Sequence, residues 1–363
     1  MILVYLVFFF LILRFTVTLF NFISNPKLTN SVRQYNQLVS ILIPARNEAE
    51  NIQGLLRSIQ NQDYKNFELI VLDDHSDDAT FDICSRFAVA DPRFKILPGL
   101  DLPKGWLGKN FACSQLAKAA TGEYLLFLDA DEVVASGLIN NAIHRMKINR
   151  LTLLSLFSNQ MMFSIGERLV VPLMHFLLLN LLPLRLVRLS TNPAFAAASG
   201  QFMLFEAQSY QQHQWHDLVK NKVVEDIEIM KLVKAYKLRG EALLANGYIY
   251  CRMYRSLGQA LEGFSKNLLA GFNNSVVSLC TYMFLVFFGP FAIAYYLDLQ
   301  LLVFAVGLII LSRIMISLSS GQNPWLNILL HPLQMFMLLI LSVLSMQKHF
   351  TKTVTWKGRT IKT

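Results

Sequence analysis

Hydrophobic residues follow two patterns along this chain, continuous runs near both ends and short alternating runs in the middle. Residues 1–24 are almost entirely apolar, which matches the ~20 residues needed to cross a bilayer core. Three further apolar stretches cover 276–297, 299–319 and 325–346. Because the first stretch lacks the basic start and small-residue cleavage site of a signal peptide, we predict a retained transmembrane anchor, with a cleaved leader as the alternative. Membrane helices are predicted over 276–346.

The basic residues near the membrane segments predict their orientation. Lys27 and Arg33 follow the first segment, which favours a cytoplasmic middle domain. Three spans after that domain would place the basic tail, 347–363, outside. The run 325–346 is broken at His331 by the following proline, so we expect it to be re-entrant or interfacial and the tail to be cytoplasmic. The predicted location is the cell (inner) membrane, with several passes.

Arg14 is the one charge within the first segment. A charge at that depth is unfavourable by roughly 2.5–3.5 kcal/mol on insertion scales. We expect its side chain to snorkel, to shift the span, or to face a neighbouring helix.

The middle of the chain alternates strand patterns with helix patterns. Short apolar runs at 39–43, 67–72 and 124–128, with a weaker one at 94–97, predict strands. Apolar positions spaced three and four apart predict helices between them, for example through Ile52, Leu55, Leu56 and Ile59, or through Phe81, Cys84, Phe87 and Ala88, and over 109–120. This alternation predicts an α/β fold with a mostly parallel, Rossmann-like sheet.

Polar side chains follow three of these predicted strands. They are Arg46 and Glu48 after the first, Asp73 and Asp74 at the second, and Asp129 and Asp131 after the fourth. In parallel sheets the ligand lies beyond the carboxyl ends of the strands. Two carboxylates one residue apart suit Mg²⁺ or Mn²⁺, which completes its coordination with phosphates and water. A nucleoside diphosphate is the expected partner, and a solvated turn is the alternative for the acidic pair.

Composition agrees with a membrane protein. Hydrophobic residues make up 54% of the 363 residues and the mean hydropathy is +0.40. The net charge of +9 is accounted for by basic residues that flank the membrane, so no nucleic-acid partner is expected. Cysteines 84, 113, 251 and 280 have no metal-ligand spacing and are expected to be free thiols.

Five motifs occur in an order and spacing that resembles the inverting family 2 glycosyltransferases of the GT-A fold. They are PARNEAENI (44–52), VLDDHSDD (71–78), GWLGKNFA (105–112), DADE (129–132) and VVED (223–226). The resemblance covers about residues 36–270, which we take as the GT-A domain. GWLGKN, EGFSKN and the terminal TWKGR resemble the hopanoid- and carotenoid-associated membrane glycosyltransferases and, more distantly, ceramide glucosyltransferases.

The resemblance implies a role for each matching residue of a UDP-sugar site. Pro44, Ala45, Arg46 and Glu48 match the loop that holds the nucleoside, and Asp73 with Asp74 match the acids that read uracil and ribose. Lys109 matches the basic residue beside the nucleotide. Asp129 and Asp131 match the metal and ribose ligands, with Asp131 favoured for direct coordination.

Asp226 matches the general base of an inverting transfer. Such a transfer needs one carboxylate to take the proton of the acceptor hydroxyl as its oxygen attacks the anomeric carbon. Glu225 and Glu228 lie nearby, and like charges raise a carboxyl pKa. The alternative is a solvated acidic start of a helix, which the helix dipole favours.

Two segments bear on the acceptor. The Gln-x-x-Arg-Trp motif of polymer synthases is replaced by RMYRSLGQALEGFSKN at 252–267. On a helix, Arg252 and Arg255 would share a face and contact the diphosphate, or they bind lipid headgroups instead. The apolar segment 168–190 contains Pro172 and Pro183, so we expect an interfacial or re-entrant segment, with a buried core helix pair as the alternative.

These observations predict transfer of a single hexose from a UDP-sugar to a membrane lipid resembling a carotenoid, hopanoid or sphingolipid. One alternative is transfer to polyprenyl phosphate. Another is a membrane protein that binds nucleotides without catalysis.

Overall fold

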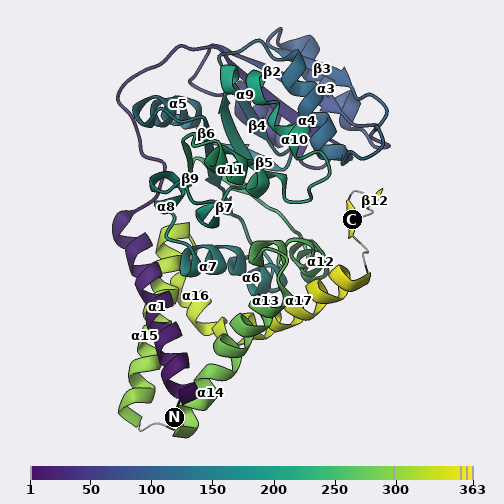
Figure 1. Ribbon diagram of the computed structural model, residues 1–363. Helices are drawn as coiled ribbons and strands as arrows, with labels where there is room; N and C mark the ends of the chain where they lie inside the picture. The colour runs from purple at the N-terminus through teal and green to yellow at the C-terminus, as the bar shows by residue number, and fades with distance from the viewer. Residues whose placement is uncertain (1, 297–298, 352–353, 357–358, 362–363) are drawn as a thin grey trace. The chain divides into compact units, whose positions relative to one another are not determined.

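The chain divides into two units that interleave along the sequence. The computed structural model (Figure 1) describes residues 2–296, 299–351, 354–356 and 359–361, with side chains as far as residue 351. One unit, here the helical unit, comprises residues 1–25, 160–184 and 253–363, and the other, the sheet unit, comprises 26–159 and 185–252. Of the predicted basic tail, residues 352–353, 357–358 and 362–363 lie outside the described residues, as do 297–298.

The sheet unit is built on a seven-stranded sheet. Its strand order is β3-β2-β1-β4-β8-β6-β9, and β8 alone of these runs antiparallel to its neighbours. The strands are β1 (Val39–Ala45), β2 (Phe67–Asp73), β3 (Phe94–Pro98), β4 (Tyr124–Leu128), β6 (Leu153–Phe157), β8 (Phe202–Glu206) and β9 (Gly240–Leu244). The predicted α/β class with a mostly parallel sheet is therefore confirmed.

Helices connect and cover these strands. They are α2 (Ile52–Gln60), α3 (Thr80–Ala90), α4 (Gly108–Ala119), α5 (Leu138–Asn149), α8 (Leu186–Leu189), α9 (Ala207–His213), α10 (Trp215–Leu218) and α11 (Glu225–Ala235). In α2 the four apolar residues predicted to form one face are all buried. The helix predicted through Phe81 and Ala88 is α3, in which Phe81 is 42% exposed and Thr80 is buried. The Thr80 hydroxyl accepts the Glu48 backbone N–H at 2.8 Å, so a polar contact sets that end of the helix.

A small second sheet lies next to the acidic pair. It has the order β5-β10-β7 and is formed by β5 (Glu132–Val134), β10 (Ile249–Cys251) and β7 (Asn159–Gln160). Strands β5 and β10 are antiparallel, with Glu132 opposite Cys251. The chain thus enters a new strand one residue after Asp131.

The helical unit contains the apolar segments. Its helices are α1 (Ile2–Ser24), α6 (Ile165–Val170), α7 (Pro172–Leu181), α12 (Leu257–Asn267), α13 (Val276–Met283), α14 (Gly289–Tyr296), α15 (Leu299–Ser320), α16 (Pro324–Leu329) and α17 (His331–Thr351). Among the described residues, four stretches are long and apolar enough to cross a membrane: 2–24, 276–296, 299–320 and 331–351. Helices α1 and α15 lie side by side, and α17 runs obliquely to both (Figure 1). A short hairpin, β11 (Val354–Trp356) with β12 (Arg359–Ile361), follows α17.

The prolines discussed above lie at the ends of helices in this unit. Pro332 is the second residue of α17, where its missing N–H leaves no bond unmade, so the break expected at His331 is the start of a helix of 21 residues. Pro172 begins α7 and Pro183 follows its end, so neither interrupts that helix. Whether 168–190 and 325–346 are interfacial stays a prediction.

Arg14 faces a neighbouring helix, one of the three expectations for this residue. Its Nε donates to Oδ1 of Asn180 on α7 at 2.6 Å. Asn21 lies further along the same helix, and its side chain donates to the Leu179 and Leu182 carbonyls at 2.9 and 2.8 Å. Polar side chains therefore tie α1 to α7.

Candidate functional site

The polar residues predicted after three strands meet at one edge of the main sheet. Strand β1 is parallel to both β2 and β4, and Ala45 is paired with Asp73 in the register. Asp129 follows directly on the last residue of β4. Parallel neighbouring strands end at the same edge, so this convergence follows from the topology.

Two loops at this edge are linked by hydrogen bonds. Arg46, after β1, donates from Nη1 to the Asp74 carbonyl at 2.6 Å and lies 4.0 Å from its carboxylate. Asn47 has a positive φ of 53°, and its backbone N–H donates to the Ser76 hydroxyl at 2.9 Å. Each loop is therefore held by the other.

Asp73 is buried at the end of β2 with one oxygen uncommitted. Its Oδ2 accepts the Ser76 backbone N–H at 3.1 Å. Its Oδ1 is buried and has no hydrogen-bond partner among the described residues. A buried carboxylate oxygen without a donor is costly, so it is ready to accept an N–H from a ligand. Pro44 and Ala45 lie on the adjacent β1, and the side chain of Glu48 accepts a bond from Asn51 at 3.0 Å.

Lys109 joins two carboxylates from distant parts of the sequence. Its Nζ lies 2.8 Å from Asp129 Oδ1 and 3.1 Å from Glu225 Oε1. Burial lowers the pKa of the Lys109 ammonium, but Asp129 and Glu225 outweigh burial and raise that pKa well above its usual value. Lys109 is the second residue of α4, where the helix dipole disfavours a cation, so the two carboxylates are what stabilise it there.

Asp226 lies next to this ion pair, in the first turn of α11. Its Oδ2 accepts the Gly200 backbone N–H at 2.8 Å, and its Oδ1 accepts that of Ile227 at 2.8 Å. Burial and then the Glu225 charge raise the pKa of Asp226 to about 7, while the two backbone donors and Lys109 act in the opposite direction. A pKa near neutrality suits a general base.

Glu225 and Gly200 belong to the site but were not assigned to it from the sequence. A Cβ built on Gly200 would lie 3.0 Å from Lys109 Nζ and 3.1 Å from Glu225 Oε1, which leaves little room for a side chain. A side chain at residue 200 would therefore crowd Lys109 and Glu225 at the point where the Gly200 N–H donates to Asp226. In the sequence, the only local sign of this role is a glycine shortly before the residues that form strand β8.

Asp131 lies close to two side chains of the small sheet. Its Oδ2 is 3.5 Å from the Cys251 Sγ, and ligand atoms of Asp131, Glu132 and Cys251 lie within 4.8 Å of one another. Burial, then Asp129 and Glu48, raise the pKa of Asp131 to about 7. Lys109 pairs with Asp129, whereas Asp131 forms no ion pair with any described residue, and a carboxylate in that position fits a divalent cation.

Glu132 is fully buried behind Asp131. Its Oε2 accepts the Ser158 hydroxyl at 3.0 Å, while Oε1 has no hydrogen-bond partner among the described residues. Burial, followed by the charges of Asp131 and Asp129, raises the pKa of Glu132 well above its usual value. This carboxyl group therefore holds its proton more strongly than an exposed glutamate does.

The two arginines after β10 correct one expectation. Arg252 and Arg255 lie in the irregular stretch before α12, which begins at Leu257, so they do not share a helix face. Arg252 belongs to the sheet unit and Arg255 to the helical unit. The predicted diphosphate contact stays a prediction for both.

Part of the chain matches a known protein family. Residues 40–210 match the family model described as glycosyl transferase family 2. A UDP-Glc:alpha-D-GlcNAc-diphosphoundecaprenol beta-1,3-glucosyltransferase of Escherichia coli is 35% identical over 114 residues, which are 31% of this chain and 43% of that protein. A 4,4'-diaponeurosporenoate glycosyltransferase of Staphylococcus haemolyticus is 25% identical over 244 residues, 65% of this chain and 62% of that protein. Both alignments span less than two thirds of the relative.

One solved structure shares the fold. A mannosyltransferase of Pyrobaculum calidifontis, in complex with GDP-Man and Mn²⁺, is similar to this chain with a TM-score of 0.56. The match covers 95% of this chain and 99% of that one, at 16% sequence identity. At this identity the likeness concerns the fold alone.

Proposed function

We propose that this chain transfers one hexose from a UDP-sugar to a membrane lipid with inversion at the anomeric carbon, because residues 40–210 match the family model described as glycosyl transferase family 2. The observation that carries the proposal is Asp226, a half-buried carboxylate with a pKa of about 7 beside the ion pairs that Lys109 forms with Asp129 and Glu225.

Asp226 acts as the general base. It takes the proton of the acceptor hydroxyl while that oxygen forms a bond to the anomeric carbon, and the bond from that carbon to the UDP oxygen breaks with its electron pair going to UDP. The acceptor hydroxyl must reach the oxygens of Asp226 at hydrogen-bond distance. Its two backbone donors hold the carboxylate in one orientation.

The nucleotide is held at the ends of β1 and β2. The unpartnered Oδ1 of Asp73 accepts the ring N–H of uracil, and Asp74 with the Arg46 loop lies against the ribose. Pro44, Ala45 and Glu48 shape the same loop. Lys109 supplies positive charge near the diphosphate.

A divalent cation, Mg²⁺ or Mn²⁺, binds at Asp131. The support is the Asp131 carboxylate, which forms no ion pair with a described residue, and its cluster with Glu132 and Cys251, although a thiol is an unusual partner for these hard cations. The ion would neutralise charge that develops on the departing diphosphate. Asp129 stays bound to Lys109 and contributes to the site indirectly.

The acceptor is a lipid in the membrane that the helical unit occupies. Four described helices are long and apolar enough to cross a bilayer. The two relatives above act, by their names, on a diphosphoundecaprenol-linked sugar and on diaponeurosporenoate, both of which have long apolar chains. Lys27 and Arg33 support a catalytic domain on the cytoplasmic side.

The test uses membranes that contain the full chain and a panel of radiolabelled UDP-sugars. We expect one sugar to label the organic-solvent extract, EDTA to abolish the labelling, and added Mg²⁺ or Mn²⁺ to restore it. Label only in water-soluble polymer would overturn the lipid acceptor. Full activity in EDTA would overturn the metal.

In the same assay, the Asp226→Asn variant distinguishes transfer to polyprenyl phosphate from transfer to a lipid hydroxyl. A phosphate acceptor is already ionised, so that variant would keep most of its activity, whereas a hydroxyl acceptor requires the base. Glu228→Gln is the matched control because Glu228 lies in the same helical turn but is paired with Lys231 at 2.8 Å.

A further inference from the structure

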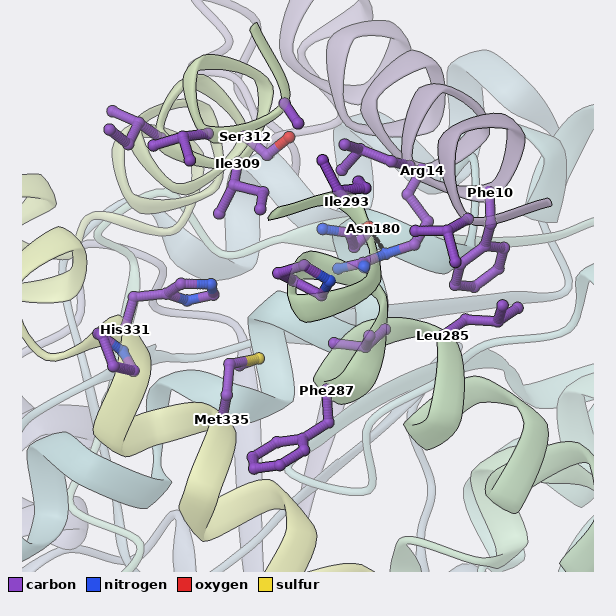
Figure 2. A pocket seen from close by; sticks show the side chains of 18 of the residues that line it. Phe10, Arg14, Asn180, Leu285, Phe287, Ile293, Ile309, Ser312, His331 and Met335 are labelled. Carbon is purple, nitrogen blue, oxygen red and sulfur yellow. Dashed lines mark hydrogen bonds between the residues drawn. The ribbon is translucent and has the colours of Figure 1, made fainter. Parts of the chain in front are cut away.

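A large apolar cavity lies within the helical unit, among α1, α7, α14, α15 and α17. Its volume is about 510 Å³, and its lining is mostly aliphatic and aromatic. This volume falls in the range of about 300–1,000 Å³ that is typical of small-ligand sites. Figure 2 shows Phe10, Leu285, Ile309 and Met335 around it, with the Arg14 side chain pointing toward Asn180.

Two arginine side chains meet at one aromatic ring of this cavity. The guanidinium carbons of Arg14 and Arg313 lie 5.4 and 4.8 Å from the centroid of the Phe176 ring, which lines the cavity. Arg14 donates to Asn180, and Arg313, which is 1% exposed, donates to Gln334. Both arginines bond to neutral amides, which leaves two positive charges in one apolar region.

No carboxylate neutralises these charges among the described residues. The sequence of the helical unit contains only three acidic residues, Glu167, Glu262 and Asp298, and the last lies outside the described residues. Glu262 pairs with Lys266 at 3.2 Å, and Glu167 accepts bonds from Phe163 and Ser164. Buried charges are ordinarily paired, and ionisable groups within a membrane ordinarily mark a binding site.

Polar atoms without partners lie near the two arginines and the Phe176 ring. Arg313 Nε, His331 Nδ1 and Tyr282 Oη are buried without a hydrogen-bond partner among the described residues. The rings of Phe176 and His331 have centroids 5.9 Å apart, and the Arg14 guanidinium lies 5.6 Å from the Tyr282 ring. Donors that lack acceptors indicate that an acceptor belongs there.

We propose that this cavity binds a single-chain lipid carboxylate. The hydrocarbon chain occupies the apolar lining, and the carboxylate accepts hydrogen bonds from Arg14 and Arg313. Arginine binds carboxylates in a bidentate manner, so one small group neutralises the charge that the protein leaves unpaired. The proposal concerns binding alone and holds whether or not the chain transfers sugar.

The depth of Arg14 favours a carboxylate over a phospholipid. Arg14 is 12 residues from the start of α1 and 10 from its end, which corresponds to about 18 and 15 Å of helix at 1.5 Å per residue. A phospholipid headgroup remains at the bilayer surface, whereas a carboxylic acid can enter as its neutral form. The cavity volume also suits one chain better than two.

The test measures binding of radiolabelled oleic acid to the purified full chain in phosphatidylcholine nanodiscs. We expect saturable binding at one molecule per chain. Oleyl alcohol, which has the same chain without the charge, should compete at least ~10-fold less well, because hydrogen bonds to charged groups contribute about 1.5–3 kcal/mol. Equal competition by oleyl alcohol would overturn the carboxylate, and equal competition by phosphatidic acid would overturn the single-chain assignment.

Two kinds of variant test the arginine charge and the apolar cavity separately. Arg14→Gln should weaken oleate binding by about 10–100-fold, while Arg14→Lys should retain most of it because the charge remains. Ala305→Phe should block the chain without touching either arginine, since Ala305 is 2% exposed and lines the cavity. Arg86→Gln, an exposed arginine of the sheet unit, is the control and should bind like the natural protein.

Folding is checked in the same samples by thermal unfolding. If Arg14→Gln unfolds, the oleate affinities of Arg14→Lys and Ala305→Phe still test whether the cavity binds the lipid carboxylate. Unchanged oleate affinity in a folded Arg14→Gln or Ala305→Phe protein would overturn the proposal.

Discussion

Lys109 Nζ lies 2.8 Å from Asp129 Oδ1, so the start of α4 is joined to the end of the central strand of the sheet. The same ammonium group contacts Glu225 at 3.1 Å, at the start of α11. Three segments that are far apart in the sequence therefore share one cation. That contact decides which carboxylates are neutralised, and within the described part of the chain neither Asp131 nor Asp226 forms an ion pair.

Replacing Lys109 with methionine should impair both stability and activity. The change leaves Asp129 and Glu225 as unpaired carboxylates, and breaking a buried ion pair costs about 3–5 kcal/mol. Because the three side chains are 9–28% exposed, we expect the lower end of that range. Chemical denaturation measures it. Lys231→Met is the control, since its partly exposed pair with Glu228 should contribute about 0–1 kcal/mol, and equal losses in both variants would contradict the assignment.

Asp226→Asn should lower turnover by about 10²–10⁴-fold and leave UDP-sugar binding nearly unchanged, as expected for loss of a general base. Steady-state kinetics and a separate donor-binding measurement check both parts. In the natural protein, activity should rise with pH through about 7 as the Asp226 carboxyl loses its proton. Turnover that ignores the substitution would remove Asp226 from the mechanism.

Asp226 should also make stability depend on pH. Its pKa is raised from 3.8 to about 7 by folding, so between those values the folded chain holds a proton that the unfolded chain has lost. Its contribution to the free energy of unfolding is therefore present below about pH 4 and declines as pH rises to 7. Thermal unfolding of the natural protein and of Asp226→Asn at pH 5 and pH 8 measures this contribution. Relative to the natural protein, the variant should be more stable at pH 8 than at pH 5.

Gly200→Ala should reduce activity more than it reduces stability. The added Cβ would lie 3.0 Å from Lys109 Nζ and must displace that side chain or the loop that bonds Asp226. Misplacement of about 1 Å in a catalytic group can cost ~10²-fold in rate. Gly258→Ala is the matched control, because nothing lies within 4 Å of its Cβ and alanine favours the helix. Normal kinetics in Gly200→Ala would show that the close approach is unimportant.

Glu68→Gln should destabilise the sheet unit by about 1–3 kcal/mol at pH 7, since its charged hydrogen bonds are lost. The Glu68 carboxylate accepts from the Ser40 hydroxyl and from both the backbone and hydroxyl of Thr121, each at 2.7 Å, and from Lys95 at 3.0 Å. Burial raises the pKa of Glu68, but these donors outweigh burial and lower that pKa to about 2.

The contribution of Glu68 to stability changes with pH in the opposite direction to that of Asp226. Its folded pKa is depressed, so its contribution is complete above about pH 4.5 and is lost as pH falls through 2. Denaturation at pH 7 and pH 3 measures this, with Glu123→Gln as an exposed control. A variant as stable as the natural protein at pH 7 would contradict the role of the Glu68 network.

The sequence by itself determined the elements and the edge at which the site lies. Short β-rich apolar runs such as 39–43 and 124–128 indicate buried internal strands, and periodic apolar positions define α2. Parallel strands then bring Asp73 and Asp129 to the same edge. Arg14 could be recognised as unusual from its apolar neighbours alone, although its partner Asn180 could not.

Only the tertiary structure decided how the charges are matched. Lys109, Asp129 and Glu225 are separated by 20 and 96 residues, so no local pattern relates them. Gly200 matters because of what its absent side chain would contact, and Glu132 is buried because β5 pairs with β10. Likewise, only the folded structure brings Arg14 and Arg313 to the same Phe176 ring. Periodicity reports which face of an element is apolar, whereas pairing of charges depends on distances that exist only after the chain has folded.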